Sequence, residues 1–328
     1  MLKNSERSKH FVVFFGYFCG HNNYKSYNNV RHTSESSSKR TRLYVLLALL
    51  AIVIAIGAFA YTTCSKAVTA ERHVRYAGIM NIASEKLAKT IRGMEMNAMN
   101  EFDEVEKHLD SPDAVIAALE SKTDLNHEVR GYFAAFEPDY FPQKGKWFEP
   151  YVHHVDSNAF EVRLVGNARH NYFKSPWYIR AKQSSESFWS EPYYYYDGTN
   201  ISGHYTTFVK PIFDKTGRLA CVCGADLTFE WLTKELQRID VDIKNNELLN
   251  SHLFGSDCDF YSVVLNKDGT SVAFPEDKKV TITEDFVIRD LERGKAGTID
   301  MTVNGVPSTV YYGPIEHVDW SIAIVVAK

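Results

Sequence analysis

Aromatic side chains, many of them with a polar group, are concentrated in the middle of the chain, where they could bind a small ligand. They are Tyr132, Tyr140, Phe141, Trp147, Phe148, Tyr151, Tyr172, Phe173, Trp177, Tyr178, Trp189, Tyr205 and the run Tyr193–Tyr196. Neighbouring residues of a strand point to opposite sides, so the tyrosines of the run cannot all face inward. Buried tyrosine hydroxyls also need hydrogen-bond partners. The pattern predicts an aromatic pocket with polar groups; the alternative is that many of these rings simply pack in a core.

Asp226 stands at the end of the apolar run Leu219–Ala225, where an uncompensated carboxylate would be costly. One interpretation is that a cationic or hydroxyl-bearing ligand meets this carboxylate. The other is that Asp226 caps the helix predicted at Phe229–Ile239, although Thr228 is better placed for that role. Under the first interpretation the ligand carries an amine or several hydroxyl groups.

Histidines gather at His153, His154, His170 and His204. Adjacent residues of a strand point to opposite faces, so His153 and His154 cannot easily bind one ion, and we expect no metal and no cofactor. The sequence contains none of the motifs GxGxxG, GxxxxGK[ST], GxSxG or HExxH, and we expect no enzyme. The competing interpretations are an extracytoplasmic hydrolase or metal-binding protein, and an adhesion module that uses exposed tyrosines.

The cysteines give a weak indication of the redox compartment. Cys221 and Cys223 alternate on a predicted strand and share one face, a spacing at which two cysteines bridge poorly. A disulfide from either to Cys258 is one alternative, and small buried hydrophobic residues are the other.

An uncharged segment precedes all of these residues. Leu43–Tyr61 holds nineteen residues without charge or proline. As a helix it would span roughly 28 Å, close to the bilayer core of about 30 Å. Lys39, Arg40 and Arg42 lie just before it, and the positive-inside rule then places the N-terminus in the cytoplasm. We expect a single-pass protein of the cell (inner) membrane with its main body outside the cytoplasm.

Composition and charge agree with this division. A hydrophobic content of 45% and a charged content of 24% are ordinary for a globular protein and exclude wholesale disorder. The net charge of −4 divides into +6 over residues 1–42 and −10 over residues 65–328. The acidic body argues against nucleic-acid binding.

A long helix is predicted from Lys66 to Asp110 because apolar residues recur at a period near 3.6. This stripe consists of Met80, Ala83, Leu87, Ile91, Met94, Ala98, Phe102, Val105 and Leu109. We expect it to face the body and to leave the opposite face to Lys86, Lys89, Arg92 and Glu101. We expect the membrane-proximal part of this helix, near Val68–Ile79, to pair in parallel with the same segment of a second copy, which predicts a homodimer. A second helix should begin after Ser111, with proline at its first position, and end near Lys122.

After this helix the apolar period changes to two, which indicates strands. The predicted strands are Val129–Phe136, Trp147–Val155, Phe160–Val165, Tyr205–Ile212, Leu219–Leu227, Phe260–Leu265, Ser271–Phe274, Gly297–Val303, Ser308–Tyr312 and Trp320–Val326, with turns at Asp156–Asn158, Asp214–Gly217, Lys267–Gly269 and Asn304–Gly305. We therefore predict an α+β fold in which a transmembrane helix is followed by a long helix that carries two PAS-like antiparallel-sheet modules. The predicted divisions are 1–42, 43–61, 65–123, 125–235 for the membrane-distal module and 240–328 for the membrane-proximal module.

Four short segments carry a resemblance to a known family. They are Ser175–Tyr178, Trp189–Tyr193, Lys210–Gly217 and Gly224–Leu227. Their order and spacing, and the long helix that precedes them, resemble the double Cache (dCache) extracytoplasmic sensor domain. The resemblance covers about residues 65–328. The resemblance implies PAS-like modules on a shared helix, with ligand bound in the membrane-distal one.

A finer resemblance concerns Phe136–Pro138 and Trp147–Tyr151. These segments are similar to a bacterial subgroup in which the sensor is joined to a cytoplasmic SpoIIE-type serine phosphatase. Members of the family continue into a second membrane span and an effector, which this chain lacks as written up to Lys328. We therefore expect the chain to be a fragment or the product of a shortened gene.

The resemblance also implies site residues. In amino-acid-binding members an arginine holds the ligand carboxylate, and an aspartate on the Gly-x-Asp strand holds the amino group. Trp177, Tyr178, Tyr193 and Asp226 fit the family pattern, whereas Ser175 stands where the arginine would be.

Three further residues complete the predicted site. His170 replaces an aromatic hydroxyl five residues before Ser175, and Lys174 could supply the missing positive charge, though without the bidentate fork of an arginine. Tyr205 should lie with Asp226 on the sheet face beneath the ligand. The implied function is a membrane-anchored sensor for a small ligand, such as an amine or an amino acid.

Overall fold

The computed structural model describes residues 34–123, 128–155, 159–196, 202–246 and 259–328. Cys258 and the turn predicted at Asp156–Asn158 lie outside these residues. The chain divides into two compact units, Met1–Lys66 and Ala67–Lys328.

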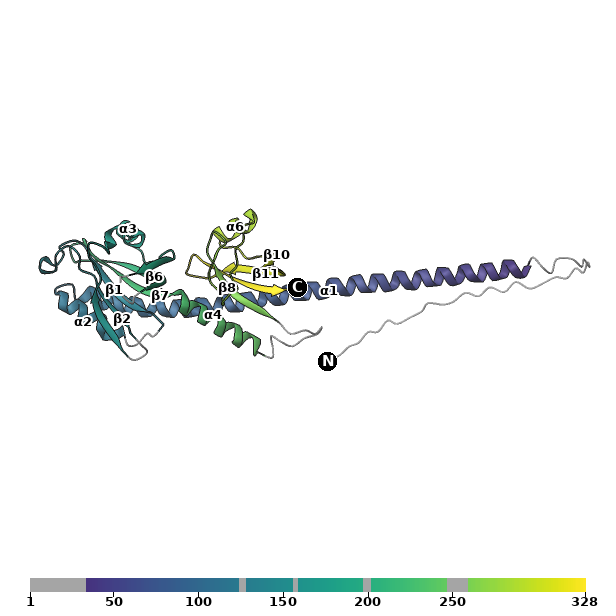
Figure 1. The fold of residues 1–328 in the computed structure, drawn as a ribbon, viewed down its shortest axis with the longest axis horizontal. Coiled ribbons are helices and arrows are strands. Elements are labelled where there is room, and N and C mark those ends of the chain that lie inside the picture. The colour runs from purple at the N-terminus through teal and green to yellow at the C-terminus, as the bar shows by residue number, and fades with distance from the viewer. Residues whose placement is uncertain (1–33, 124–127, 156–158, 197–201, 247–258) are drawn as a thin grey trace, which may run out of the picture. The chain divides into compact units, whose positions relative to one another are not determined.

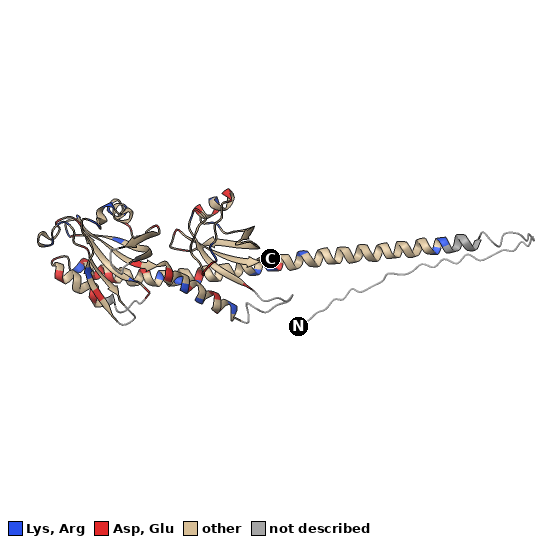
Figure 2. Cartoon of the chain, viewed as in Figure 1, with Lys and Arg blue, Asp and Glu red and all other residues tan. Residues whose placement is uncertain are grey.

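Within the first unit, helix α1 contains the uncharged segment. The helix as a whole has the bounds Ser34–Lys107. The side chains of Leu43–Tyr61 are exposed, and Figure 2 shows no charged residue along them. Among the described residues α1 is the one helix long and apolar enough to cross a membrane.

In the second unit the predicted apolar stripe of α1 is confirmed: it is buried from Met80 to Val105, and Leu109 is partly buried. Lys86, Lys89 and Arg92 are exposed as predicted. The prediction for Glu101 is wrong, because its side chain is buried. Residues three and four apart on a helix share a face, and Glu101 stands between the buried positions 98 and 105.

A larger antiparallel sheet follows α1 and helix α2 (Pro112–Thr123). Its strands are β1 (Gly131–Phe136), β2 (Pro150–His154), β3 (Phe160–Leu164), β4 (Phe188–Trp189), β5 (Tyr193–Tyr196), β6 (Ser202–Phe213) and β7 (Leu219–Thr228). The strand order is β3-β2-β1-β7-β6-β4, and β5 also pairs with β6. The predicted hairpin of β6 and β7 is confirmed, and its turn ends on Gly217 at a φ of 81°.

Both faces of this sheet are buried, because successive residues of β1 and β7 alternate between two apolar clusters. Tyr132 and Cys223 belong to the cluster that contains the stripe of α1. Phe133 and Val222 belong to a second cluster with helix α3 (Pro176–Gln183). Figure 1 shows α1 and α3 on opposite sides of the strands.

A smaller antiparallel sheet forms the C-terminal part of the second unit. Its strands are β8 (Phe260–Leu265), β9 (Ser271–Ala273), β10 (Gly297–Val303), β11 (Val306–Pro314) and β12 (Ser321–Ala327), in the order β10-β11-β12-β8-β9. The predictions for β8 and β10 match these bounds. Helix α6 (Asp285–Glu292) was not predicted; it buries only Val287 and Leu291, too few apolar residues to give a clear helical period.

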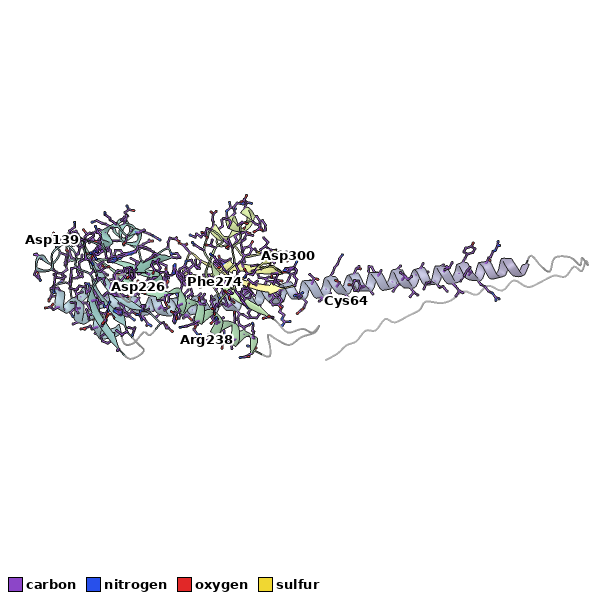
Figure 3. The ribbon with its side chains drawn as sticks, in the orientation of Figure 1. Cys64, Asp139, Asp226, Arg238, Phe274 and Asp300 are labelled. Atoms are coloured by element: carbon purple, nitrogen blue, oxygen red, sulfur yellow. The ribbon has the colours of Figure 1, made fainter. Side chains whose placement is uncertain are left out.

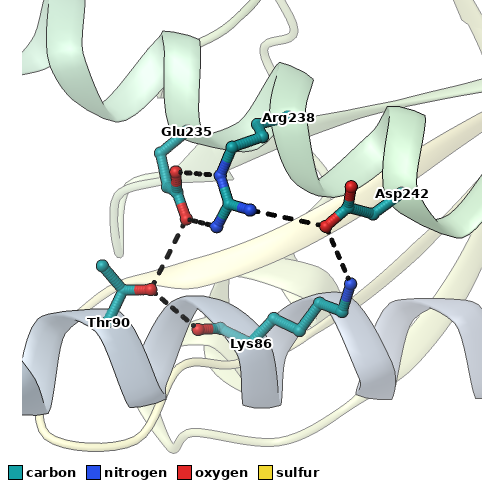
Figure 4. Close-up of polar contacts among 5 residues, drawn as sticks. All are labelled: Lys86, Thr90, Glu235, Arg238 and Asp242. Atoms are coloured by element: carbon teal, nitrogen blue, oxygen red, sulfur yellow. Dashed lines mark hydrogen bonds and ion pairs between the residues drawn. The ribbon is translucent and has the colours of Figure 1, made fainter.

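Helix α4 (Phe229–Lys244) connects the two sheets and continues past its predicted end at Ile239. Figure 4 shows how it is tied to α1. Arg238 Nη2 lies 2.6 Å from Glu235 Oε1, and Arg238 Nη1 lies 3.4 Å from Asp242 Oδ2. From α1, Lys86 Nζ approaches Asp242 Oδ2 to 3.2 Å, and Thr90 donates a hydrogen bond of 3.5 Å to Glu235. This network joins the connecting helix to the long helix.

Thr228 caps α4, because its side-chain oxygen accepts a hydrogen bond of 3.2 Å from the backbone nitrogen of Trp231. Replacement of a capping threonine by alanine typically costs about 1 kcal/mol. We expect Thr228→Ala to lower the free energy of unfolding by this amount in urea denaturation. Thr228→Ser keeps the hydroxyl and should stay within a few tenths of a kcal/mol of wild type. Equal losses in both variants would contradict a capping role.

Candidate functional site

Two adjoining pockets, which we call the inner and the outer chamber, lie on the α3 side of the larger sheet. The inner chamber has a volume of about 30 Å³ and is lined by Phe133, Glu149, Tyr151, Val165, His170, Trp177, Tyr193, Tyr195 and Asp226. The outer chamber has a volume of about 370 Å³ and is lined by His170, Ser175, Pro176, Trp177, Arg180, Phe188, Ser190, Glu191, Pro192 and Tyr193–Tyr195. The chambers share four side chains, those of His170, Trp177, Tyr193 and Tyr195. Together they offer a small chamber that contains Asp226 and Glu149 and a larger one that contains Arg180.

Asp226 lies near the end of β7 and points into the inner chamber; Figure 3 marks its place in the fold. Its Oδ1 accepts hydrogen bonds from Thr207 Oγ1 at 2.7 Å and from the Tyr193 hydroxyl at 3.3 Å. Burial raises the pKa of this carboxyl group to about 6, although these hydrogen bonds oppose the shift. The helix-cap interpretation of Asp226 is wrong, because Thr228 holds that position.

The tyrosine run forms β5, and its side chains alternate as a strand requires. Tyr193 and Tyr195 line the inner chamber, whereas Tyr194 and Tyr196 are exposed. The Tyr193 hydroxyl lies 2.6 Å from Thr207 Oγ1. Burial, together with the nearby carboxylate of Asp226, raises the pKa of the Tyr193 hydroxyl and keeps it protonated as a donor.

Glu149 is the second acid of the inner chamber, and its side chain is buried just before β2. Its Oε2 lies 3.2 Å from His170 Nε2. Burial raises the pKa of Glu149, and His170 opposes the shift. Sequence reasoning missed this residue. The available signal was an acid in the apolar run that continues into β2.

Aromatic rings form the walls of the inner chamber. Phe133 and Trp177 are in contact, with ring centroids 5.0 Å apart. Gly224 on the neighbouring strand makes room for Phe133, because a Cβ at this position would lie 2.1 Å from Phe133 Cζ. The glycine of the Gly-x-Asp segment therefore positions an aromatic wall beside Asp226.

The structure brings four of the predicted site residues together in the inner chamber: His170, Trp177, Tyr193 and Asp226. The other three lie elsewhere. Tyr178 donates a hydrogen bond of 2.8 Å to Glu137 outside both chambers, and Tyr205 is buried behind the rings of Tyr193 and Tyr195. Lys174 is exposed and lines neither chamber, since it belongs to the short helix η2 (Tyr172–Lys174) that precedes α3.

Arg180 is the cation that does line the outer chamber, and the sequence pattern did not single it out. Its guanidinium carbon lies 3.8 Å from the centroid of the Phe188 ring, and Nη1 donates a long hydrogen bond of 3.5 Å to the backbone oxygen of Trp189. These contacts hold the guanidinium group in the lining of the outer chamber.

His153, from the predicted group of histidines, lies outside both chambers. His153 Nε2 lies 3.0 Å from Glu161 Oε1, and its ring stacks on Tyr151 with centroids 5.2 Å apart. Burial lowers the pKa of His153. Within the part of the chain that the structure describes, no group of three or more histidine, cysteine, aspartate or glutamate residues is arranged to hold a metal ion.

Several solved structures share the fold of this chain. An extracellular domain assigned to the histidine kinase mmHK1S-Z3 is 20% identical, with a TM-score of 0.60 over 78% of this chain and 95% of that chain. The ligand-binding domain of the Pseudomonas fluorescens chemoreceptor CtaA, in complex with L-isoleucine, is 18% identical, with a TM-score of 0.51 over 77% of this chain and 91% of that chain. The periplasmic sensory domain of the Campylobacter jejuni chemoreceptor Tlp1 is 14% identical, with a TM-score of 0.54 over 77% and 95%. This chain has the fold of such extracellular sensor domains.

A family model identifies one part of the chain more narrowly. Residues 115–234 match the first PDC sensor domain of methyl-accepting chemotaxis protein-like proteins. This region contains the larger sheet and both chambers of the cavity. Among curated proteins, none matches the chain.

Proposed function

We propose that this chain is a membrane-anchored sensor that binds a small ligand with an amino group in the cavity of the larger sheet. The observation that carries the proposal is Asp226, a buried carboxylate that faces a small chamber with aromatic walls. A buried charge requires a partner, and a ligand ammonium group would provide one. Aromatic rings add a favourable interaction with a cation. CtaA, a relative in fold, was solved with amino acids, which carry such a group.

We propose that the residues of the two chambers bind a ligand and do not catalyse a reaction. The inner chamber brings together carboxylates and hydroxyl groups that can hold a ligand, and Arg180 in the outer chamber could meet a ligand carboxylate. For an amino acid, the amino group would lie against Asp226 and the side chain in the outer chamber. In this arrangement Arg180 supplies the positive charge that meets the ligand carboxylate, a role that the sequence analysis expected of Lys174.

We further propose how the signal leaves the sensor. The N-terminus of α1 would lie in the cytoplasm, the second unit outside the inner membrane, and parallel pairing of α1 would form a homodimer. Ligand binding would shift α1 relative to the larger sheet, biasing an equilibrium in a cytoplasmic effector. The similarity of Phe136–Pro138 and Trp147–Tyr151 to sensors of SpoIIE-type serine phosphatases supports a phosphatase as that effector.

A thermal-shift series on the full chain in detergent tests the ligand class. We expect n-butylamine and L-isoleucine to raise the melting temperature, because each brings an ammonium group to Asp226. Butyrate has the same chain length as butylamine and carries only a carboxylate, so it serves as the matched control and should have no effect. Stabilisation by butyrate without stabilisation by either amine would contradict the proposal.

Amine binding should depend on pH through Asp226. Burial holds its folded-state pKa at about 6, above the ordinary aspartate value of 3.8, so the free protein keeps a proton on Asp226 at mildly acidic pH. An ammonium ligand favours the ionised form, and affinity should fall about tenfold per pH unit as pH drops below 6. Calorimetric titration with butylamine measures this slope. His204→Gln is the control, because His204 is exposed and lines neither chamber, and it should retain the slope. A pH-independent affinity would contradict the role of Asp226.

A further inference from the structure

The inner chamber contains an acid–base pair beside Asp226 that the ligand class alone does not explain. Glu149 Oε2 and His170 Nε2 are 3.2 Å apart, and the Glu149 side chain is almost fully buried. The ring of Tyr195 packs edge-on against the imidazole, with centroids 5.0 Å apart. These contacts hold His170 beside Glu149.

The charges of this chamber can be counted from its lining. Among the described residues that line it, the ionisable acids and bases other than tyrosine are Glu149, Asp226 and His170. Two buried carboxylates without a cation would repel each other, and the carboxylate of Glu149 does raise the pKa of Asp226. A protonated His170 leaves a net charge of −1, whereas loss of His170 would leave −2.

We infer that His170 neutralises Glu149, so that the chamber presents one net negative charge and selects ligands with a single ammonium group over diamines. This inference rests on the proposed amine-binding function. It makes His170 and Glu149 a pair that determines specificity, with Asp226 as the direct partner of the ligand. Removal of one member of a buried pair leaves the other charge uncompensated, which is why the effect should be large.

Two probes of equal chain length test this inference. Calorimetry at pH 7 on the full chain in detergent compares n-butylamine, which carries one charge, with 1,4-diaminobutane, which carries two. Wild type should bind butylamine more tightly. His170→Gln should shift the ratio of the two dissociation constants toward the diamine by about tenfold, the equivalent of one charge-assisted hydrogen bond.

A double variant separates a charge effect from structural damage. His170→Gln with Glu149→Gln restores a net charge of −1 and should return the ratio to near the wild-type value. A purely structural role for either residue predicts no such return. The matched control is His204→Gln, because His204 is exposed in the same sheet and lines neither chamber.

The outcomes distinguish the two proposals. If wild type binds neither amine, the proposed function fails and the inference fails with it. If wild type binds butylamine but His170→Gln leaves the ratio unchanged, or the double variant keeps the shifted ratio, the inference alone is overturned.

Discussion

Phe102→Ala should destabilise the second unit by about 3–5 kcal/mol, the usual cost of removing a fully buried phenylalanine ring. The Phe102 side chain has no exposed surface. Its ring packs between Tyr132, at a centroid distance of 6.4 Å, and Phe208, at 6.3 Å. The substitution would therefore leave a cavity where α1 meets the larger sheet.

Chemical denaturation of the full chain in detergent measures this loss. The control is Met96→Ala, on the same helix, because Met96 is 63% exposed and its loss creates no cavity. We expect this control to stay within about 0.5 kcal/mol of wild type. Similar effects of both substitutions would mean that α1 does not pack on the sheet through its apolar stripe.

Asp226→Asn should weaken butylamine binding by about 10- to 150-fold, because a charge-assisted hydrogen bond is worth about 1.5–3 kcal/mol. The substitution keeps the size of the side chain and removes its charge. The free energy of unfolding without ligand should not fall at pH 7, since burial already disfavours the charged form of Asp226. We therefore expect the affinity for butylamine to fall while the free energy of unfolding without ligand does not.

The matched control for this change is Asp139→Asn. Asp139 is exposed and has a positive φ of 57°, a conformation that asparagine also tolerates. It lines neither chamber. We expect unchanged affinity for butylamine in this control. Undiminished binding by Asp226→Asn would place the amine in another cavity.

The strands were predictable where the sequence shows period two between turn residues. Asn304 and Gly305 adopt positive φ angles of 50° and 82°, and the strands on either side of them form the predicted hairpin. The alternation of the tyrosine run also follows from local geometry. Strand β4 was missed, because Phe188 and Trp189 are too few to show a period and are defined by their pairing with β6.

The site could be predicted only in part, because tertiary packing decides which of its residues meet. His170, Trp177, Tyr193 and Asp226 were predicted from their residue types and from the family resemblance, but their convergence depends on how α3 packs on the sheet. Glu149 was missed although it interrupts the apolar run that continues into β2, because the sequence alone does not show which side chains its carboxylate meets. Lys174 and Arg180 are both cations in or just before α3, and tertiary packing decides which of them lines a chamber.

The alternation of β5 has an evolutionary consequence. Tyr193 and Tyr195 line the inner chamber, whereas Tyr194 is exposed beside the outer chamber and Tyr196 is exposed and lines neither chamber. Natural substitutions should accumulate at Tyr196 without loss of ligand recognition. Insertion or deletion of a single residue before the strand would exchange the two sets, since side chains alternate with a period of two. Related sequences should therefore conserve the distance in residues between Trp189 and this strand more strictly than the identity of every tyrosine within it.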